Sequence, residues 1–344
     1  MSATPATLGA TAAPAPAGSP RRALWQRPIL LAGLLAAAAG FFVPGLIDTP
    51  YTLSLLINGV VLGIAAVGIG FLMHQCGFVM FGVAAFIGLP AYLVGIGSAQ
   101  LGLGLTSAVV FALVGSTAFA ALVGALVVRA RPLPFAMLTL ALAQMLKQVS
   151  MLQVMRPITG GDDGLTMSFD GTFLGLTQSA LGKAPSFWPL AWAALCLVIL
   201  IAWVAAHSRF GQVLRATQAN EERMRFSGFD TYWPPLAAFT LSAFLVSISG
   251  VLIALNSAYA SPELLDFATG GHALTAMIVG GGATALGPLL GAMLYTWGQS
   301  AFGATGYLEL LTGIAVVVMI SAFPKGAMGF VLQIGHRLTG RKGP

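Results

Sequence analysis

The sequence predicts an all-α polytopic membrane protein. Only 8% of its 344 residues are charged, while 57% are hydrophobic; soluble globular proteins carry about 25% charged residues. The mean hydropathy is +0.89. So few charges cannot cover the surface of a soluble fold of this size, so most apolar side chains must face lipid. A series of long apolar segments, most near the roughly 20 residues that a spanning helix needs, supports the same conclusion.

The beginning of the chain divides into a polar tail and a first apolar stretch. Residues 1–20 are rich in Ala, Pro, Thr and Gly, a composition that cannot form a packed core. We therefore expect residues 1–28 to be a disordered cytoplasmic tail. The uncharged run 29–47 is long enough to span a bilayer. A cleaved signal peptide is the alternative, but an uncleaved first helix is favoured because many further spans follow.

Eight further apolar segments follow, and with the first they define a membrane domain over residues 29–330. Lipid offers no water to backbone groups, so we expect helices rather than open sheets. None of the segments has the alternating pattern of a barrel strand. The segments cover approximately residues 51–73, 78–97, 101–128, 133–155, 187–206, 236–255, 273–297 and 307–323.

The basic residues predict the orientation of these segments. Four clusters contain 13 of the 16 Lys and Arg residues, and each cluster bounds an apolar segment. They therefore indicate a positive-inside bias, rather than the nucleic-acid binding that a net charge of +6 suggests. We expect both termini, including the tail 331–344, to be cytoplasmic. The clusters are Arg21, Arg22 and Arg27; Arg129 and Arg131; Arg209, Arg215, Arg223 and Arg225; and Lys325, Arg337, Arg341 and Lys342.

One segment conflicts with this orientation. Three apolar segments lie between Arg225 and Lys325, yet two cytoplasmic ends require an even number of crossings. The segment 273–297 contains a glycine triplet at 280–282 and the pair Gly287-Pro288, which interrupt helices. We therefore expect about eight transmembrane helices, plus a broken or re-entrant element near 273–297.

The loop 208–235 is a polar stretch between two spans and lies on the expected cytoplasmic side. Its residues 211–228 have helical propensity, and Gly228 suits a helix C-terminal cap. A pump driven by a separate ATPase needs a short rigid helix on its cytoplasmic side. An ordinary solvated connection between two spans explains the loop equally well.

Several motifs occur in a consistent order from about residue 51 to residue 329. They are Gly77…Phe86-Ile-Gly88…Ala91-Tyr92; Phe135-Ala-Met-Leu-Thr139-Leu; Thr159-Gly-Gly-Asp-Asp-Gly164-Leu165; the loop 208–235; Ser261-Pro262-Glu263; Gly281-Gly282…Gly287-Pro288…Gly291; and Pro324-Lys-Gly326…Gly329. Together they resemble the permease family of branched-chain amino acid ATP-binding-cassette (ABC) transporters, specifically the longer, LivM-like member of the two paired permease types.

The resemblance implies a non-catalytic subunit of a heteromeric importer in the bacterial inner membrane. The implied partners are a second permease subunit, two ABC ATPase subunits and an external solute-binding protein. The chain has no Gly-x-x-x-x-Gly-Lys-Ser/Thr phosphate loop, so ATP and Mg²⁺ are expected to be used by the ATPase subunits and no cofactor is expected here. The implied solute is a branched-chain or other small amino acid. The implied ATPase-coupling residues are Arg215, Asn220, Glu221, Glu222 and Gly228.

The external loop that contains two adjacent aspartates has two interpretations. Paired aspartates can hold Mg²⁺ and a diphosphate, as in membrane prenyltransferases, but that chemistry needs further converging carboxylates. The alternative, which we favour, is a tight turn whose glycines permit positive φ and whose aspartates are solvated or bind a partner protein. No metal site is expected. The residues of this loop are Thr159, Gly160, Gly161, Asp162 and Asp163.

Glycine-interrupted segments in matching positions of two halves point to a substrate path. The segments 78–97 and 273–297 each hold the third place in their half of the chain. Polar residues on neighbouring helices could then contact the solute. The resulting candidate path residues are Thr139, Gln144, Ser242, Gly281 and Gly282.

Lys147 lies inside an apolar segment, where a charge is costly and function is the default hypothesis. It is near the outer end of its segment, so we favour snorkelling of its ammonium to the interface. The alternative function is a stand-alone channel or a secondary transporter for a small polar solute such as urea. Ion-coupled carriers keep paired ionisable residues in the membrane, and the sequence shows no evident acidic partner for Lys147.

Overall fold

The computed structural model describes residues 40–41, 43–45, 49–130, 132–168, 171–173, 175–281, 286–302, 310 and 313–314. The chain divides into two compact units, Met1–Val43 and Pro44–Pro344. Few residues of the first unit are described, and the architecture below is that of the second. The expected tail 1–28, nearly all of the expected first helix 29–47, most of the last segment 307–323 and the tail 331–344 lie outside the described residues.

Helices make up most of the described chain. The helices are η1 (Val43–Gly45), α2 (Pro50–Cys76), α3 (Val83–Ala99), α4 (Leu105–Val127), α5 (Pro132–Met151), α6 (Arg156–Thr159), η2 (Gly161–Asp163), α7 (Gln178–Leu181), α8 (Ala184–His207), α9 (Arg209–Ala219), α10 (Glu221–Phe226), α11 (Trp233–Ser257), η3 (Pro262–Leu265), α12 (Phe267–Gly280) and α13 (Gly287–Phe302). The strands are β1 (Leu165–Thr166) and β2 (Tyr259–Ala260), a short antiparallel pair that an all-α prediction does not include.

Four described helices, α2, α4, α8 and α11, are long and apolar enough to cross a membrane. A fifth span is counted if α5 is joined to the segment Arg156–Asp163, which is bent from it by 97°. The membrane architecture is therefore confirmed in outline, while the described residues contain four or five such spans rather than about eight.

The expected span 78–97 is shorter in the structure, which explains part of the difference, and the first helix of the segment expected to be broken is also short. Helix α3 has 17 residues because the chain is not helical between Gly77 and Gly82, and α12 has 14. At 1.5 Å per residue these helices are about 26 Å and 21 Å long, below the roughly 30 Å of the hydrocarbon core.

The break expected near 273–297 is present. Helix α12 ends at Gly280 and α13 begins at Gly287, and the two helices pack against each other. A Cβ atom on Gly291 would lie 1.9 Å from the carbonyl oxygen of Ala276 and 2.5 Å from the backbone nitrogen of Gly280. Glycine is therefore required at this crossing, because any side chain would force the two backbones apart.

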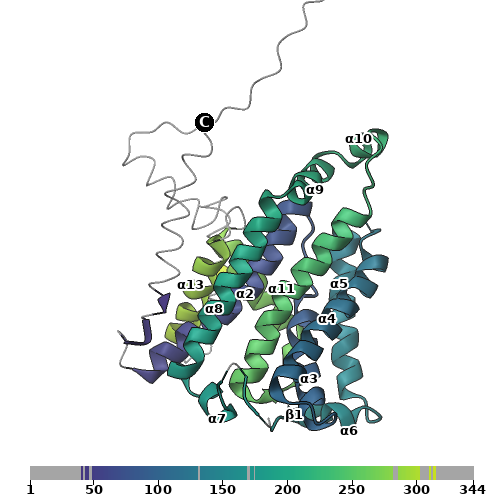
Figure 1. Ribbon diagram of the computed structural model, residues 1–344. Coiled ribbons are helices and arrows are strands. Elements are labelled where there is room, and N and C mark those ends of the chain that lie inside the picture. Colours follow the sequence, from purple (N-terminus) through teal and green to yellow (C-terminus); the bar gives the residue numbers. More distant parts are fainter. Residues whose placement is uncertain are drawn as a thin grey trace, which may run out of the picture. The chain divides into compact units, whose positions relative to one another are not determined.

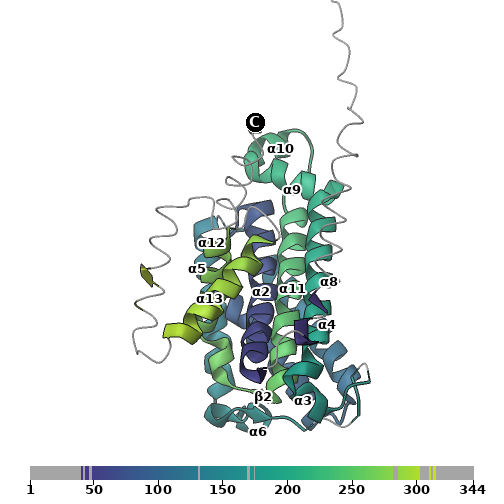
Figure 2. The same ribbon diagram turned by 90° about the vertical axis from the view of Figure 1, so that its left-hand side faces the viewer.

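Helix α2 is the centre of this unit (Figure 2). It contacts α8, α11, α12 and α13, and most of its apolar surface is buried by them. In helices α4 and α8 most residues are not buried, as expected for helices that face lipid or another subunit. The core therefore consists of α2, α3 and α11, and none of these buried helices has a hydrophilic face.

The two ends of the bundle differ (Figure 1). Helices α9 and α10 lie together at one end, here called the α9–α10 end. Helices α6 and α7 and strand β1 lie at the other, here called the sheet end. There β1 pairs with β2, with Leu165 opposite Ala260, and the Tyr259 hydroxyl donates to the carbonyl oxygen of Asp163 at 2.7 Å.

Candidate functional site

The polar loop expected to form one helix forms two, α9 and α10, separated at Asn220. The backbone of Asn220 is extended, with φ −163° and ψ 98°, and its side-chain oxygen accepts from the backbone N–H of Arg223 at 2.8 Å. Asparagine favours this N-cap role, so it ends one helix and begins the next. At the other end of α10, Gly228 has φ +81°. The N–H groups of Gly228 and Phe229 donate to the carbonyls of Arg225 and Met224, a Schellman cap that confirms the expected role of this glycine.

Helix α9 is anchored to the bundle. Its Leu214 is 1% exposed, and the helix contacts α2, α8 and α11. The Arg215 guanidinium donates to the side-chain oxygen of Gln75, near the end of α2, at 3.4 Å and to the carbonyl oxygen of Ala206 at 3.1 Å. Arg215 therefore links the loop to the central helix.

Helix α10, in contrast, has no buried residue. Glu221 and Glu222 lie in its first turn, where carboxylates interact favourably with the helix dipole, and the Thr231 hydroxyl donates to Glu221 at 3.3 Å. A cavity of about 460 Å³ lies between this helix and the ends of α2 and α4. Helix α10 thus projects from the bundle and presents nearly all of its surface.

Exposed aromatic residues lie at the end of α10 and in the segment that follows it, and none of them is among the site residues predicted from the sequence. Phe226 is 90% exposed, Phe229 52% and Trp233 65%. A group of exposed apolar side chains on a polar element indicates a surface that another protein covers. The sequence offers a signal for two of them, because Phe226 and Phe229 lie within a charged loop, outside every apolar segment.

The loop at the sheet end is a tight turn, as expected. Gly160, Gly161 and Gly164 all have positive φ, between +64° and +77°. The Thr159 hydroxyl donates to the carbonyl oxygen of Ser150 at 2.7 Å, which fixes the turn to the end of α5. The side chain of Asp163 pairs with Arg156 at 3.2 Å on an exposed surface, and Asp162 is exposed.

The structure places the candidate path residues at different helix contacts. Thr139 of α5 is fully buried, and its hydroxyl accepts from the backbone N–H of Gly82 at 3.3 Å. Ser242 of α11 is fully buried and donates to the carbonyl oxygen of Gly68 at 2.8 Å. Gly281 is buried at the end of α12 with φ +87°, while Gly282 lies outside the described residues. Thr139 and Ser242 thus bond to the backbones of two different segments.

An aromatic cluster occupies the space beside Thr139 and Ser242. Phe239 lies edge-on to both Phe86 and Phe135, with ring centroids 5.6 Å apart, and Phe135 stacks on Phe78 at 4.8 Å. Phe86, Phe135 and Phe239 are fully buried. Helices α3, α5 and α11 are thus joined by aromatic rings, two of which lie about one turn before the candidate path residues on α5 and α11.

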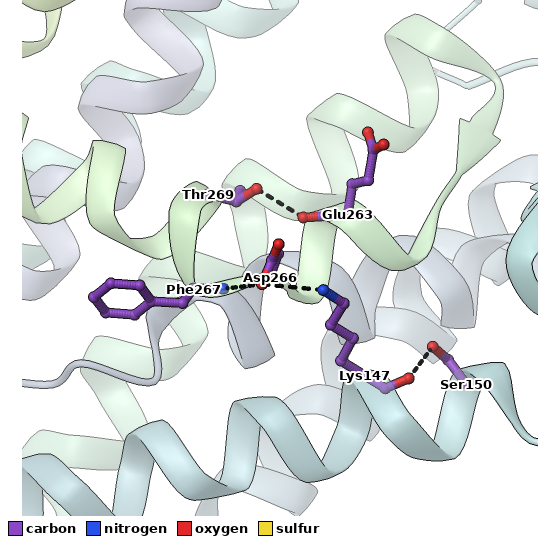
Figure 3. Close-up of polar contacts among 6 residues, drawn as sticks. All are labelled: Lys147, Ser150, Glu263, Asp266, Phe267 and Thr269. Atoms are coloured by element: carbon purple, nitrogen blue, oxygen red, sulfur yellow. Dashed lines mark hydrogen bonds and ion pairs between the residues drawn. The ribbon is translucent and has the colours of Figure 1, made fainter. Parts of the chain in front are cut away.

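Lys147 has an acidic partner in the structure, which the sequence did not reveal. Its ammonium lies 3.1 Å from the carboxylate of Asp266, with the two side chains 23% and 39% exposed (Figure 3). Asp266 is the N-cap of α12 and also accepts from the backbone N–H of Phe267 at 2.8 Å. Lys147, with smaller contributions from Phe267 and Gln144, holds the pKa of Asp266 below its usual range against the effect of burial. Tertiary structure brings the pair together from distant parts of the sequence.

The arginines are unevenly divided between the two ends of the bundle. Among the described residues, the α9–α10 end has five arginines, and Arg156 and Lys183 lie at the sheet end with the loop aspartates (Figure 1). Arg129 belongs to the α9–α10 end because its guanidinium lies over the ring of Tyr232, 5.2 Å from the centroid. The five arginines are Arg129, Arg209, Arg215, Arg223 and Arg225.

Apolar helices around a buried central helix, interrupted short helices and the projecting helix α10 indicate a multi-pass membrane protein of a kind common among transporters. Comparison with known families agrees. Residues 51–323 match the family described as "Branched-chain amino acid transport system / permease component", and the chain belongs to this family.

Two relatives show the same similarity at low sequence identity. The chain is 25% identical over 326 residues to the high-affinity branched-chain amino acid transport system permease protein LivM of Escherichia coli K12, covering 88% of this chain and 75% of that protein. It is 25% identical over 286 residues to the LivM protein of Salmonella typhimurium LT2, covering 77% of this chain and 67% of that protein. No solved structure matches.

Proposed function

We propose that this chain is a permease subunit of an ABC importer for branched-chain or other small amino acids in the bacterial inner membrane. It forms part of the translocation path and is driven by separate ATPase subunits that bind ATP and Mg²⁺. A second permease subunit and an external solute-binding protein complete the importer. Family membership supports this proposal. The observation that carries it is that helix α10 is exposed while α9, which precedes it, is anchored to the bundle.

Helix α10 is the proposed ATPase-docking element. Its first turn offers the carboxylates of Glu221 and Glu222, and its last residue is the exposed Phe226. A central aromatic anchor with charged neighbours is a common composition for an energetic hot spot. The clustering of arginines at this end supports a cytoplasmic location by the positive-inside rule. Both chain termini are then cytoplasmic.

Helix α9 is the proposed transmission element. The Arg215–Gln75 hydrogen bond and the packing of Leu214 connect the docking element to α2. Displacement of α10 by an ATPase therefore acts on the helix that contacts α8, α11, α12 and α13. The loop Thr159–Asp163 at the opposite end is the proposed contact for the solute-binding protein.

A secondary transporter is the second candidate, and one observation favours it. The Lys147–Asp266 pair is the kind of paired ionisable group that ion-coupled carriers keep near their substrate path. That candidate assigns no role to the exposed aromatic surface around α10. A carrier also has no need of an ATPase subunit.

Replacing both Glu221 and Glu222 with alanine should reduce ATP-dependent leucine uptake by about tenfold or more, because the substitution removes two charges from the proposed docking surface. Membrane insertion should not change, since α10 has no buried residue. Uptake into cells and co-purification of the ATPase subunits measure the two effects.

The variant Glu221→Asp/Glu222→Asp is the matched control, because it keeps both carboxylates in the first turn of α10. It should retain most of the uptake and the co-purification. Full uptake by the alanine variant would exclude a docking role for these two residues.

A further inference from the structure

Lys147 is the only Lys, Arg, Asp or Glu residue within the described helices α2, α3, α4, α5, α8, α11, α12 and α13. Its pair with Asp266 joins α5 to the beginning of α12 (Figure 3). The pair Arg156–Asp163 is different, because it lies within one loop and its side chains are 60% and 82% exposed. An ion pair as exposed as that contributes little to stability. Lys147–Asp266 is less exposed, with 23% and 39% of its side chains accessible, and it joins two apolar helices.

Stability alone does not explain a charge pair in this position. A partly exposed ion pair typically contributes little to stability, and apolar residues of similar volume are often at least as stabilising. The pair also remains partly accessible, with 23% and 39% of its side chains exposed. A small polar molecule can therefore reach it.

The geometry of donors and acceptors matches one class of ligand. A single oxygen of Asp266 faces both the Lys147 ammonium, at 3.1 Å, and the N–H of Phe267, at 2.8 Å. That N–H belongs to the first residue of α12, where the helix dipole favours a negative charge. A free carboxylate could replace Asp266 on these two donors. The displaced Asp266 carboxylate would then be available to a cation.

We propose that Lys147, Asp266 and the first N–H of α12 form a subsite for the charged head group of a zwitterionic α-amino acid in transit. The substrate carboxylate binds Lys147 and the N–H of Phe267, and the substrate ammonium binds Asp266. This subsite rests on the proposed transport function and adds residues that select the substrate class.

The exchange conserves charge balance at the site. The resting pair and the zwitterion are each neutral, so the complex contains two ion pairs and no unpaired charge. Gln144, one turn before Lys147 on α5, also interacts with Asp266 and remains as a neutral hydrogen-bonding partner. A cation or an anion alone would leave one charge of the site unpaired, so the subsite discriminates against both.

The test uses the complete importer with its ATPase and solute-binding subunits in lipid vesicles. Labelled leucine uptake and the ATP hydrolysis stimulated by leucine-loaded binding protein are both measured. Lys147→Met, Asp266→Asn and the double variant should each lower uptake by about tenfold or more, while stimulated ATP hydrolysis stays within about twofold of the wild type. Lys183→Met removes an exposed cation at the same end and should change neither quantity.

A purely structural pair predicts a different pattern. The double variant would then recover wild-type uptake, because no unpaired charge remains, and that recovery would overturn the proposal. The Lys147→Arg variant keeps the ion pair and should therefore still assemble. Its guanidinium, however, would bind both carboxylate oxygens of Asp266. We expect lower uptake from this variant, and unchanged uptake would also overturn the proposal. If the wild-type complex itself shows no ATP-dependent leucine uptake, the proposed function fails rather than the subsite alone.

Discussion

Replacing Phe239 with alanine is expected to lower the free energy of unfolding by about 3–5 kcal/mol. The ring is fully buried and lies edge-on to Phe86 and Phe135. Association of helices in lipid depends on van der Waals packing rather than on removal of apolar surface from water. Removing the ring therefore leaves an empty space between α3, α5 and α11, and lipid cannot replace the packing contacts that are lost there. Denaturation of the purified protein in detergent measures the effect.

The same substitution at Phe111 is the control for this prediction. Phe111 lies on α4 and is 38% exposed, so its removal leaves no enclosed cavity and should cost much less. Equal destabilisation by the two variants would show that the aromatic cluster does not hold the three helices together.

A second large effect is expected at the crossing of α12 and α13. Gly291→Ala places a Cβ atom 1.9 Å from the carbonyl oxygen of Ala276, a distance that the two backbones can relieve only by separating. Overpacking of this kind typically costs about 1–3 kcal/mol, and more where backbone must move. We expect a lower thermal midpoint and loss of transport.

Gly298→Ala provides a control within the same helix. A Cβ atom at Gly298 meets nothing within 4 Å, and alanine in a helix is more stable than glycine by about 0.5–1 kcal/mol. The two substitutions should therefore change the thermal midpoint in opposite directions. A neutral Gly291→Ala variant would contradict the close packing of the two helices.

Local sequence signals predicted the interruptions of the fold well. Glycines and prolines act on the backbone within a few residues, so the glycine triplet and Gly287-Pro288 marked the break between α12 and α13. Gly228 marked the end of α10 for the same reason. The division at Asn220 was also visible in principle, because asparagine followed by two glutamates is a typical helix start. It was not predicted, because the polar stretch was treated as one helix.

Contacts between distant segments were not predictable from the sequence. The Lys147–Asp266 pair forms because α5 and the start of α12 are neighbours, and nothing near either residue indicates the other. Thr139 and Ser242 were chosen as polar residues in apolar helices, but a hydroxyl there can equally bond a neighbouring backbone. Both hydroxyls do so in the structure, with Gly82 and Gly68.

The span count also depended on tertiary structure. A run of apolar residues predicts a crossing only if all of it is helical, and the chain between Gly77 and Gly82 is not. Helix α3 is consequently a short, buried element rather than a full span facing lipid. Hydropathy does not distinguish these two environments, because both are apolar.

Leucine uptake into vesicles that contain the importer tests the account most directly, with ATP and the ATPase subunits supplied or withheld. We expect uptake only when both ATP and the ATPase subunits are present. Uptake that is equally fast without nucleotide and without any ATPase subunit would contradict it, and would identify the chain as a channel or a secondary transporter.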